Sequence, residues 1–416
     1  MGTLDVITGL YFPASPRLCV NKEMENVWPI FLFRVEVTVV LVAISCGIFL
    51  IVLVLWEGFE TIVLPRRVTR RFRLTRFFYR STWRPWERTI SLLVRPGQQE
   101  NWLSIFGPLS LLLLLSIWAV GLVTGFALLH WGFGSAVLNR NGGTGFLTDL
   151  YLSGTTFFTL GIGDVVPLTT LARILVVIES GMGFAFLALV IGYLPALNQS
   201  FARREVSISL LDARAGSPPT ASEMLRRHGH ERGMEALRQL LHEWERWSAE
   251  FLEGHLSYPV LAYFRSQHDN QSWLAALTAI LDTCALIMAG VEGACERQAE
   301  LTFAMARHAV VDLSLVFRTR PGELKPDRLS MEKLAALRLH LAESGLKHRE
   351  GDAAEKRLTE LRLLYEPYVH ALASHFHVTI PPWIAGESSM DNWQSSAWDQ
   401  QGKGRKSSAK KGIGHF

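Results

Sequence analysis

Three long apolar stretches interrupt the polar pattern of the chain, and all of them lie within its first 200 residues. The first covers residues 37–56, with Glu36 and Glu57 at its ends. The second covers residues 102–131 and contains no Asp, Glu, Lys or Arg, and the third covers residues 174–197. A bilayer core about 30 Å thick needs about 20 apolar residues of helix. The pattern therefore predicts three transmembrane helices.

A shorter apolar stretch lies between the second and third of these helices. Residues 146–158 read FLTDLYLSGTTFF, and as a helix they would cover about 20 Å, too little to cross a bilayer. We expect Thr148 or Asp149 to cap its start. The glycine-rich segment TLGIGD follows at residues 159–164. Irregular backbone at membrane depth is tolerated only where protein buries it or water reaches it, so the pattern predicts a re-entrant loop.

The composition of the TLGIGD segment suits it to cation binding. Gly161 and Gly163 lack a Cβ atom and can adopt left-handed dihedral angles, which would turn successive backbone carbonyls toward one axis. Rings of such oxygens can replace the hydration shell of an ion. The Thr159 hydroxyl would add an inner ring, and Asp164 would raise the cation concentration at the outer mouth. The negative C-terminal end of the preceding helix favours a cation at the same place.

TLGIGD resembles the TVGYGD selectivity-filter signature of the pore-loop potassium channel superfamily. The order of outer helix, pore helix, filter and inner helix over residues 102–197 is similar as well. The resemblance implies passive K+ conduction, K+ as the permeant ion, and an inner-helix hinge at Gly183, 20 residues after Gly163. Each chain carries one filter segment, so a ring of carbonyls implies a homotetramer. The filter residues implied by the resemblance are Thr159, Leu160, Gly161, Ile162 and Gly163.

One filter position departs from that family. Ile162 stands where the family has tyrosine or phenylalanine, whose ring packs behind the filter and helps to hold its diameter. A weakly selective monovalent cation channel is therefore an alternative. A membrane-anchored scaffold or sensor with a non-conducting pore module is another. Nothing in the sequence resembles a catalytic signature or a nucleotide-binding loop, so we expect no enzyme activity, no organic cofactor and no metal beyond permeant K+.

Glu179 lies inside the third predicted span, where an acidic residue is a candidate for function. It could face the pore and concentrate cations there. It could instead pair behind the filter with a threonine or a backbone amide. A third interpretation places it near the outer end of the helix, within reach of water.

The net charge of +4 conceals a strongly basic segment. Ten arginines and one acidic residue, Glu87, lie between Arg66 and Arg95. The positive-inside rule places this segment in the cytoplasm, the N-terminus outside, and the C-terminus in the cytoplasm. We expect an amphipathic helix on anionic headgroups rather than a voltage sensor or a nucleic-acid site. The residues expected to face the acyl chains are Phe72, Phe77, Phe78, Trp83 and Trp86.

The remaining pattern is helical and polar. Residues 198–222 contain the sequence DARAGSPPTAS and are expected to form a linker. The pattern of residues 223–384 predicts a cytoplasmic bundle of five to seven helices with an unknown ligand or partner. Within this bundle, we expect residues 274–291 to form a buried core helix. The sequence thus predicts an all-α membrane protein, which we place in a bacterial inner membrane. The predicted domains are 1–32 (extracytoplasmic), 33–64 (first transmembrane helix), 65–100 (basic segment), 101–197 (pore module), 198–222 (linker), 223–384 (helical domain) and 385–416 (disordered tail).

Overall fold

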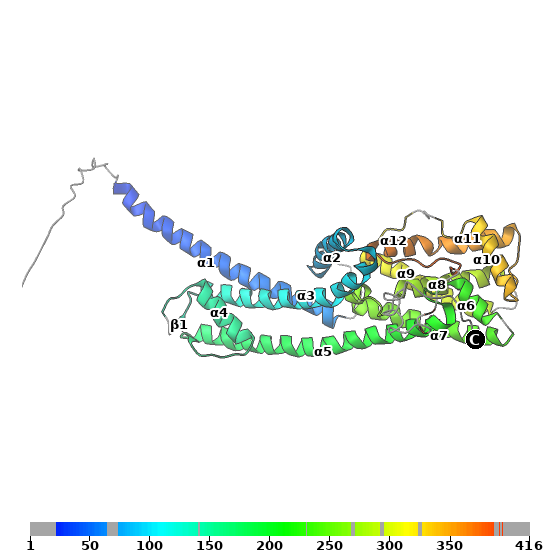
Figure 1. The fold of residues 1–416 in the computed structure, drawn as a ribbon. Coiled ribbons are helices and arrows are strands. Elements are labelled where there is room, and N and C mark those ends of the chain that lie inside the picture. Colours follow the sequence, from blue (N-terminus) through cyan, green and yellow to red (C-terminus); the bar gives the residue numbers. More distant parts are fainter. Residues whose placement is uncertain are drawn as a thin grey trace, which may run out of the picture. The chain divides into compact units, whose positions relative to one another are not determined.

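The computed structural model of the protein describes residues 22–64, 74–139, 142–229, 231–267, 271–291, 295–322 and 327–386, together with residues 391 and 393. The secondary structure of this part of the chain comprises helices and one two-stranded sheet, joined by loops and turns (Figure 1). The structure confirms the all-α class. The α-helices are α1 (Lys22–Gly58), α2 (Leu74–Leu93), α3 (Pro96–Gly132), α4 (Phe146–Phe157), α5 (Thr170–Ala215), α6 (Ala221–His228), α7 (Glu231–Ser257), α8 (Trp273–Gly290), α9 (Glu296–Phe317), α10 (Met331–Glu343), α11 (Asp352–Leu363) and α12 (Glu366–Phe376).

Four short elements complete the described fold. A π-helix, Phe59–Val63, follows α1, and a 3-10 helix, Pro259–Tyr263, follows α7. Strands β1 (Val137–Asn139) and β2 (Val165–Pro167) pair antiparallel. The chain divides into two compact units. The first unit comprises Met1–Leu53 and Val120–Ala185, and the second comprises Val54–Ala119 and Phe186–Phe416.

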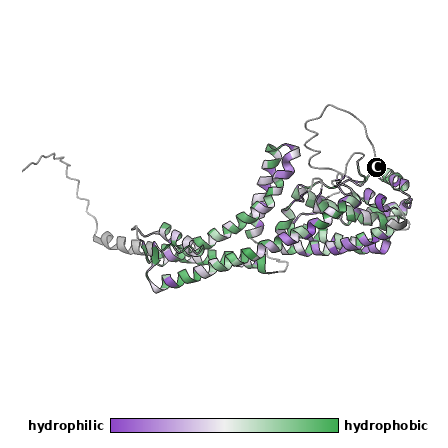
Figure 2. Ribbon diagram, turned by 60° about the horizontal axis from the view of Figure 1, so that its bottom comes forward, coloured by the Kyte–Doolittle hydropathy of each residue, from purple (hydrophilic) through white to green (hydrophobic). Residues whose placement is uncertain are grey.

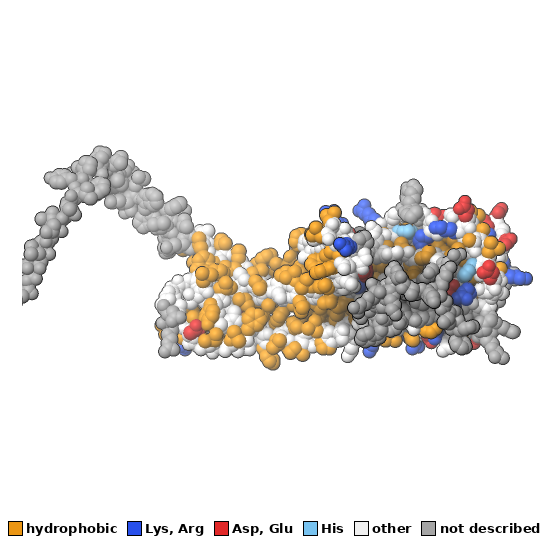
Figure 3. Space-filling view, in the orientation of Figure 1, with side chains coloured by type: hydrophobic (Ala, Val, Ile, Leu, Met, Phe, Trp, Pro, Cys, Tyr) orange, Lys and Arg blue, Asp and Glu red, His pale blue; other side chains and the backbone are white. Residues whose placement is uncertain are grey.

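Four helical segments of the described chain are long and apolar enough to cross a membrane. Three of them, Val37–Val63, Gly97–Gly132 and Thr170–Ala215, contain the predicted spans. Their outer surfaces carry exposed hydrophobic side chains, which Figures 2 and 3 show along the long helices, whereas charged side chains gather over the bundle. The fourth is α8, in which 16 of the 18 residues are buried. Such burial is typical of the core helix that the sequence predicts there.

The range predicted as a linker, residues 198–222, is structured instead. Helix α5 continues to Ala215, and Ile208, Leu211 and Ala215 are buried at helical spacing. The side chain of Arg204 donates hydrogen bonds to the carbonyl oxygens of Leu261 and Phe264, at 2.8 Å each. Apolar packing and these hydrogen bonds outweigh the turn-forming composition of the segment. The turn after α5 is therefore part of the bundle core.

The start of the predicted disordered tail is also structured, at two described positions. Arg227 pairs with Asp391, with a nitrogen–oxygen distance of 2.8 Å. The backbone N–H of Trp393 donates to Asp212 at 3.1 Å. These contacts attach residues 391 and 393 to α5 and α6. The rest of that tail, and the predicted extracytoplasmic segment up to residue 21, lie outside the described residues.

Helix α2 packs against protein more than the sequence predicts. Phe78 and Trp83, which we expected to face acyl chains, are buried, and the Trp83 indole donates to the His375 carbonyl oxygen at 2.7 Å. Phe77 is 63% exposed and Trp86 is partly buried. The expectation for Phe78 and Trp83 was wrong because protein buries both side chains, and the rings of Phe106 and Tyr263 pack against Trp83. Phe72 and the arginines at positions 66, 67, 70, 71 and 73 lie outside the described residues.

Candidate ion-conducting site

Helix α4, the predicted pore helix, begins without a side-chain cap. Gly145 occupies the N-cap position, and its carbonyl oxygen accepts from the backbone N–H groups of Thr148 and Asp149. The predicted capping role of Thr148 or Asp149 is therefore wrong, because both residues already lie inside the first turn. Asp149 is fully buried and accepts a hydrogen bond from Ser135. Its carboxylate near the helix N-terminus is favourably placed relative to the helix dipole.

A small sheet and an apolar cluster hold the two ends of the pore loop together. The register of β1 and β2 pairs Val137 with Pro167 and Asn139 with Val165. Val137 and Val165 pack against Leu152 of α4, and Val176 of α5 covers the same cluster. The segment that leaves the filter is thereby fixed to both the pore helix and the inner helix. Such support suits a loop whose backbone must keep a defined geometry.

The backbone of the predicted filter, residues 159–163, alternates in handedness. Thr159, Gly161 and Gly163 have φ angles of 56°, 55° and 79°, whereas the residues between them do not have positive φ. The sequence predicts the left-handed geometry at the two glycines but not at Thr159. A β-branched residue seldom adopts it. Here the backbone N–H groups of Thr159 and Leu160 bond to carbonyl oxygens at the end of α4, which holds the strained residue in place.

The side chains of the filter differ in their surroundings. Leu160 and Ile162 are 64% and 60% exposed in the single chain. The Asp164 carboxylate accepts the N–H of Val165 at 3.0 Å and also interacts with the hydroxyl of Tyr151 on α4. Asp164 is thus braced against the loop and the pore helix.

Glu179 belongs to a buried polar cluster that joins three helices. Its carboxylate contacts the Ser153 hydroxyl of α4, and its second oxygen lies 3.6 Å from Nε2 of His130 on α3. Ser153 also lies 2.7 Å from the Val123 carbonyl oxygen. Glu179 and Ser153 are fully buried, and His130 is 2% exposed. Among the three interpretations of Glu179, this geometry favours support behind the filter, with a serine in place of the expected threonine.

We expect Glu179→Ala to lower the thermal stability of the protein. The substitution removes a hydrogen-bond acceptor of the buried Ser153 hydroxyl and the carboxylate nearest to the buried His130 ring, and a buried unsatisfied group costs about 1–3 kcal/mol. Glu179→Gln keeps the side-chain volume and a terminal amide that can form hydrogen bonds, so its loss of thermal stability should be smaller. The measurement is the midpoint temperature at which the detergent-solubilised protein loses its size-exclusion peak. An alanine variant as stable as the original chain would contradict the supporting role.

Gly183 allows a close approach between the predicted pore helix and the inner helix. A methyl group built on it would overlap the carbonyl oxygen of Phe157 and lie 2.8 Å from the carbonyl carbon of that residue. Helix α5 is a single continuous helix through this position. The predicted hinge at Gly183 stays a prediction, and the structure adds a packing reason for glycine there.

The sequence did not point to two members of the buried Glu179 cluster. His130 and Ser153 are the partners of Glu179, and neither lies near it in the sequence. A histidine at the end of an otherwise uncharged span was the available signal, because a polar ring in an apolar helix requires a partner.

Residues 113–199 match the family model described as "Ion channel". No curated protein and no solved structure shows significant similarity to the chain. The matched range covers most of α3, the pore helix, the filter, and α5 as far as residue 199, including Glu179 and Gly183. The match indicates an ion channel of the pore-loop type, with the similarity confined to residues 113–199.

Proposed function

We propose that the protein is a potassium channel that conducts K+ passively through a filter formed by Thr159, Leu160, Gly161, Ile162 and Gly163. The alternation of left-handed residues at Thr159, Gly161 and Gly163 supports this proposal most directly. It lets successive carbonyls turn to the same side, where they can replace the hydration shell of a cation. Asp164, braced beside the filter, attracts cations to its outer mouth.

Conduction requires several copies of the chain. One chain supplies one strand of carbonyl oxygens, so a closed ring is made by four identical subunits around an axis. The exposed side chains of Leu160 and Ile162 are available for contacts between these subunits. We place the N-terminus outside and the bundle in the cytoplasm of a bacterial inner membrane, because the arginines of α2 favour the cytoplasmic side.

The proposal is tested by cation flux into liposomes that contain the purified full-length protein. We expect K+ flux to exceed Na+ flux by at least about tenfold, because a carbonyl cage built for K+ compensates the dehydration of Na+ poorly. Empty liposomes measure the leak, and a K+ ionophore gives the maximal signal. The ratio of the two initial rates is the measured quantity.

Ile162 motivates the second candidate, a weakly selective cation channel. Its side chain is 60% exposed and has no polar atom that could form a hydrogen bond between the filter and its surroundings. Equal K+ and Na+ rates would favour this candidate and overturn potassium selectivity. Absence of flux from protein of tetrameric mass, under all conditions tried, would favour the non-conducting scaffold.

A further inference from the structure

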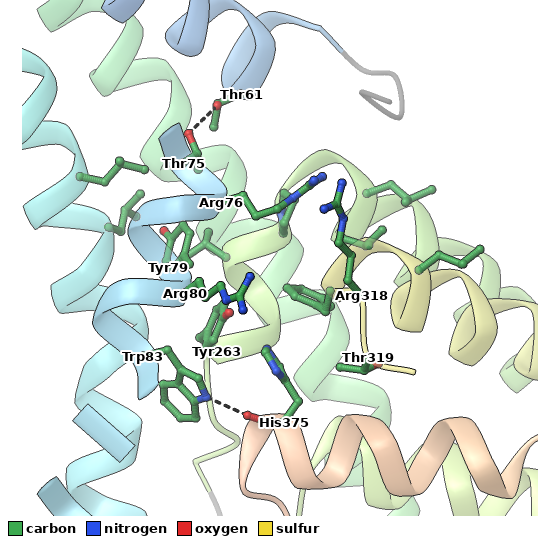
Figure 4. A pocket seen from close by; sticks show the side chains of 18 of the residues that line it. Thr61, Thr75, Arg76, Tyr79, Arg80, Trp83, Tyr263, Arg318, Thr319 and His375 are labelled. Carbon is green, nitrogen blue, oxygen red and sulfur yellow. Dashed lines mark hydrogen bonds between the residues drawn. The ribbon is translucent and has the colours of Figure 1, made fainter. Parts of the chain in front are cut away.

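The second unit contains a cavity of about 780 Å³. Its lining comes from the π-helix, α2, α3, α5, α7, the 3-10 helix, α9 and α12 (Figure 4). The volume falls within the range of sites that hold small organic ligands. None of the residues assigned to the ion-conducting site lines it. The cavity therefore needs an explanation of its own.

Arginines dominate the charge of this cavity. Four of them recur at every fourth position of α2 and so share one face of that helix. Figure 4 shows Arg76 of α2 and Arg318, at the end of α9, extending toward one another. The arginines that line the cavity are Arg76, Arg80, Arg84, Arg88, Arg318 and Arg320.

Six arginines outnumber the three carboxylates in the lining, and each carboxylate has at least one contact with a group other than these arginines. Glu60 accepts the Trp56 indole N–H at 2.7 Å. Glu87 lies 3.3 Å from Nδ1 of His377, and Asp312 lies 3.3 Å from Nε2 of His308. Within the described residues, no hydrogen bond or ion pair engages the side chains of five lining arginines, namely Arg80, Arg84, Arg88, Arg318 and Arg320.

His375 adds a neutral polar group beside the arginines. Burial, assisted by the nearby charge of Arg84, lowers the pKa of His375 to about 4, so the ring is neutral at pH 7. Its buried Nε2 atom has no hydrogen-bond partner among the described residues. In the neutral tautomer that carries its hydrogen on Nε2, this atom can donate a hydrogen bond to an anionic oxygen. The positive charge of the cavity comes from the arginines alone.

One wall of the cavity is apolar and belongs to a membrane-spanning segment. Leu111, Leu114, Leu115 and Trp118 line it, and all four lie within the candidate span Gly97–Gly132. A ligand that satisfied only the arginines would leave this wall in contact with water. A ligand that satisfied only the wall would leave the arginines without counter-charge. The lining therefore selects a molecule with an anionic head and a hydrocarbon chain.

The arginine face of α2 is held firmly. The Glu57 carboxylate at the end of α1 accepts the backbone N–H groups of Leu74 and Thr75, at 2.9 and 3.2 Å, and so caps the start of α2. Glu57 is 1% exposed. Trp83 fixes the middle of α2 through its hydrogen bond to the His375 carbonyl oxygen. A fixed helix can present its guanidinium groups with little loss of backbone entropy on binding.

We propose that this cavity binds one anionic phospholipid of the surrounding bilayer, with its phosphate on the arginines and an acyl chain along Leu111, Leu114 and Leu115. Guanidinium groups pair with phosphate oxygens in a bidentate manner, which suits a phosphate head. The inference does not depend on ion conduction. Because Tyr193 of α5 also lines the cavity, the bound lipid touches the inner helix, and its removal should change the flux.

The test is native mass spectrometry of the full-length protein in detergent, titrated with dioleoylphosphatidylglycerol. We expect one tightly bound lipid per chain. Arg80→Gln combined with Arg84→Gln should weaken that binding at least tenfold. The matched control, Arg246→Gln combined with Arg357→Gln, removes the same charge from exposed positions outside the cavity and should bind as the original chain does.

Two further variants keep the test decisive. Arg318 has a φ angle of 54°, so Arg318→Asn removes its charge while keeping a residue type that tolerates this geometry. Ser374→Trp places an indole in the cavity without changing any charge. Both should weaken lipid binding while the size-exclusion profile stays normal. Normal binding by these variants would overturn the proposal.

Two other ligands identify the source of the bound head group. Dioleoylphosphatidylcholine should bind at least tenfold more weakly, because its cation opposes the arginines. Glycerol phosphate, which has the anion without the chains, should not displace the lipid. Equal binding of phosphatidylcholine would overturn the role of the arginines. Displacement by glycerol phosphate at similar concentration would overturn the role of the apolar wall and favour a soluble anion.

Discussion

Gly163→Ala is expected to abolish K+ flux through the reconstituted channel. The φ angle of Gly163 is 79°, a left-handed geometry that costs an alanine about 1–2 kcal/mol. The proposed filter repeats this cost in every subunit, so the strand should rotate to a right-handed conformation and turn a carbonyl away from the axis. The measurement is the initial rate of K+ uptake by liposomes, which should fall to that of empty liposomes.

A control variant separates the effect of the backbone angle at Gly163 from any steric effect of the added methyl group. A methyl group on Gly163 would meet no atom within 4 Å in the single chain. Gly181→Ala is the matched control, because Gly181 is helical and equally open, and it should conduct normally. Flux through Gly163→Ala at the rate of this control would remove the carbonyl ring from the proposed mechanism.

Gly183→Ala is expected to prevent assembly of the pore module. Its methyl group would overlap the backbone of Phe157, 3.0 Å from the Cα atom and nearer still to the carbonyl group. Backbone cannot move aside as a side chain can, so the cost should reach or exceed the upper end of the about 1–3 kcal/mol typical of overpacking. The displaced residue ends the pore helix next to Phe158 and Thr159, so the filter should be distorted as well.

This variant also distinguishes a packing role from a hinge role. If Gly183 serves only to let the inner helix bend, the alanine variant should assemble normally and show an altered open fraction. If the close approach matters, the variant should lose its oligomeric size-exclusion peak or melt at a much lower temperature than Gly181→Ala and Gly192→Ala. A methyl group at either control position meets no atom within 4 Å.

The elements of the pore could be predicted because their signals are local. Apolar length marks the three spans, and the spacing of Gly161 and Gly163 marks the filter. The left-handed angle at Thr159 was not predictable, because threonine disfavours it and only the hydrogen bonds to the end of α4 impose it. Local composition therefore identified the segment but not its full geometry.

Contacts between distant residues account for most of what the sequence did not indicate. Trp83 and His375 are 292 positions apart, and their hydrogen bond explains why α2 is buried on one face. The pairing of Glu179 with His130 and Ser153 likewise depends on how three helices meet. The turn-like composition of residues 212–222 suggested a linker, yet contacts with α6 and with residues 271, 391 and 393 bury part of that turn. A single sequence contains no direct record of such contacts.

The carboxylate of Asp282 has a consequence for the biosynthesis of the chain. Helix α8 has a mean hydropathy of 1.7, high enough to resemble a span, and Asp282 lies near its middle. In the folded bundle Arg328 and Tyr365 each approach this carboxylate to 2.5 Å. Both partners are translated after α8, so the carboxylate reaches the translocon unpaired. An aspartate at the centre of a helix costs about 2.5–3.5 kcal/mol to insert, and this cost favours release of α8 into water until its partners arrive.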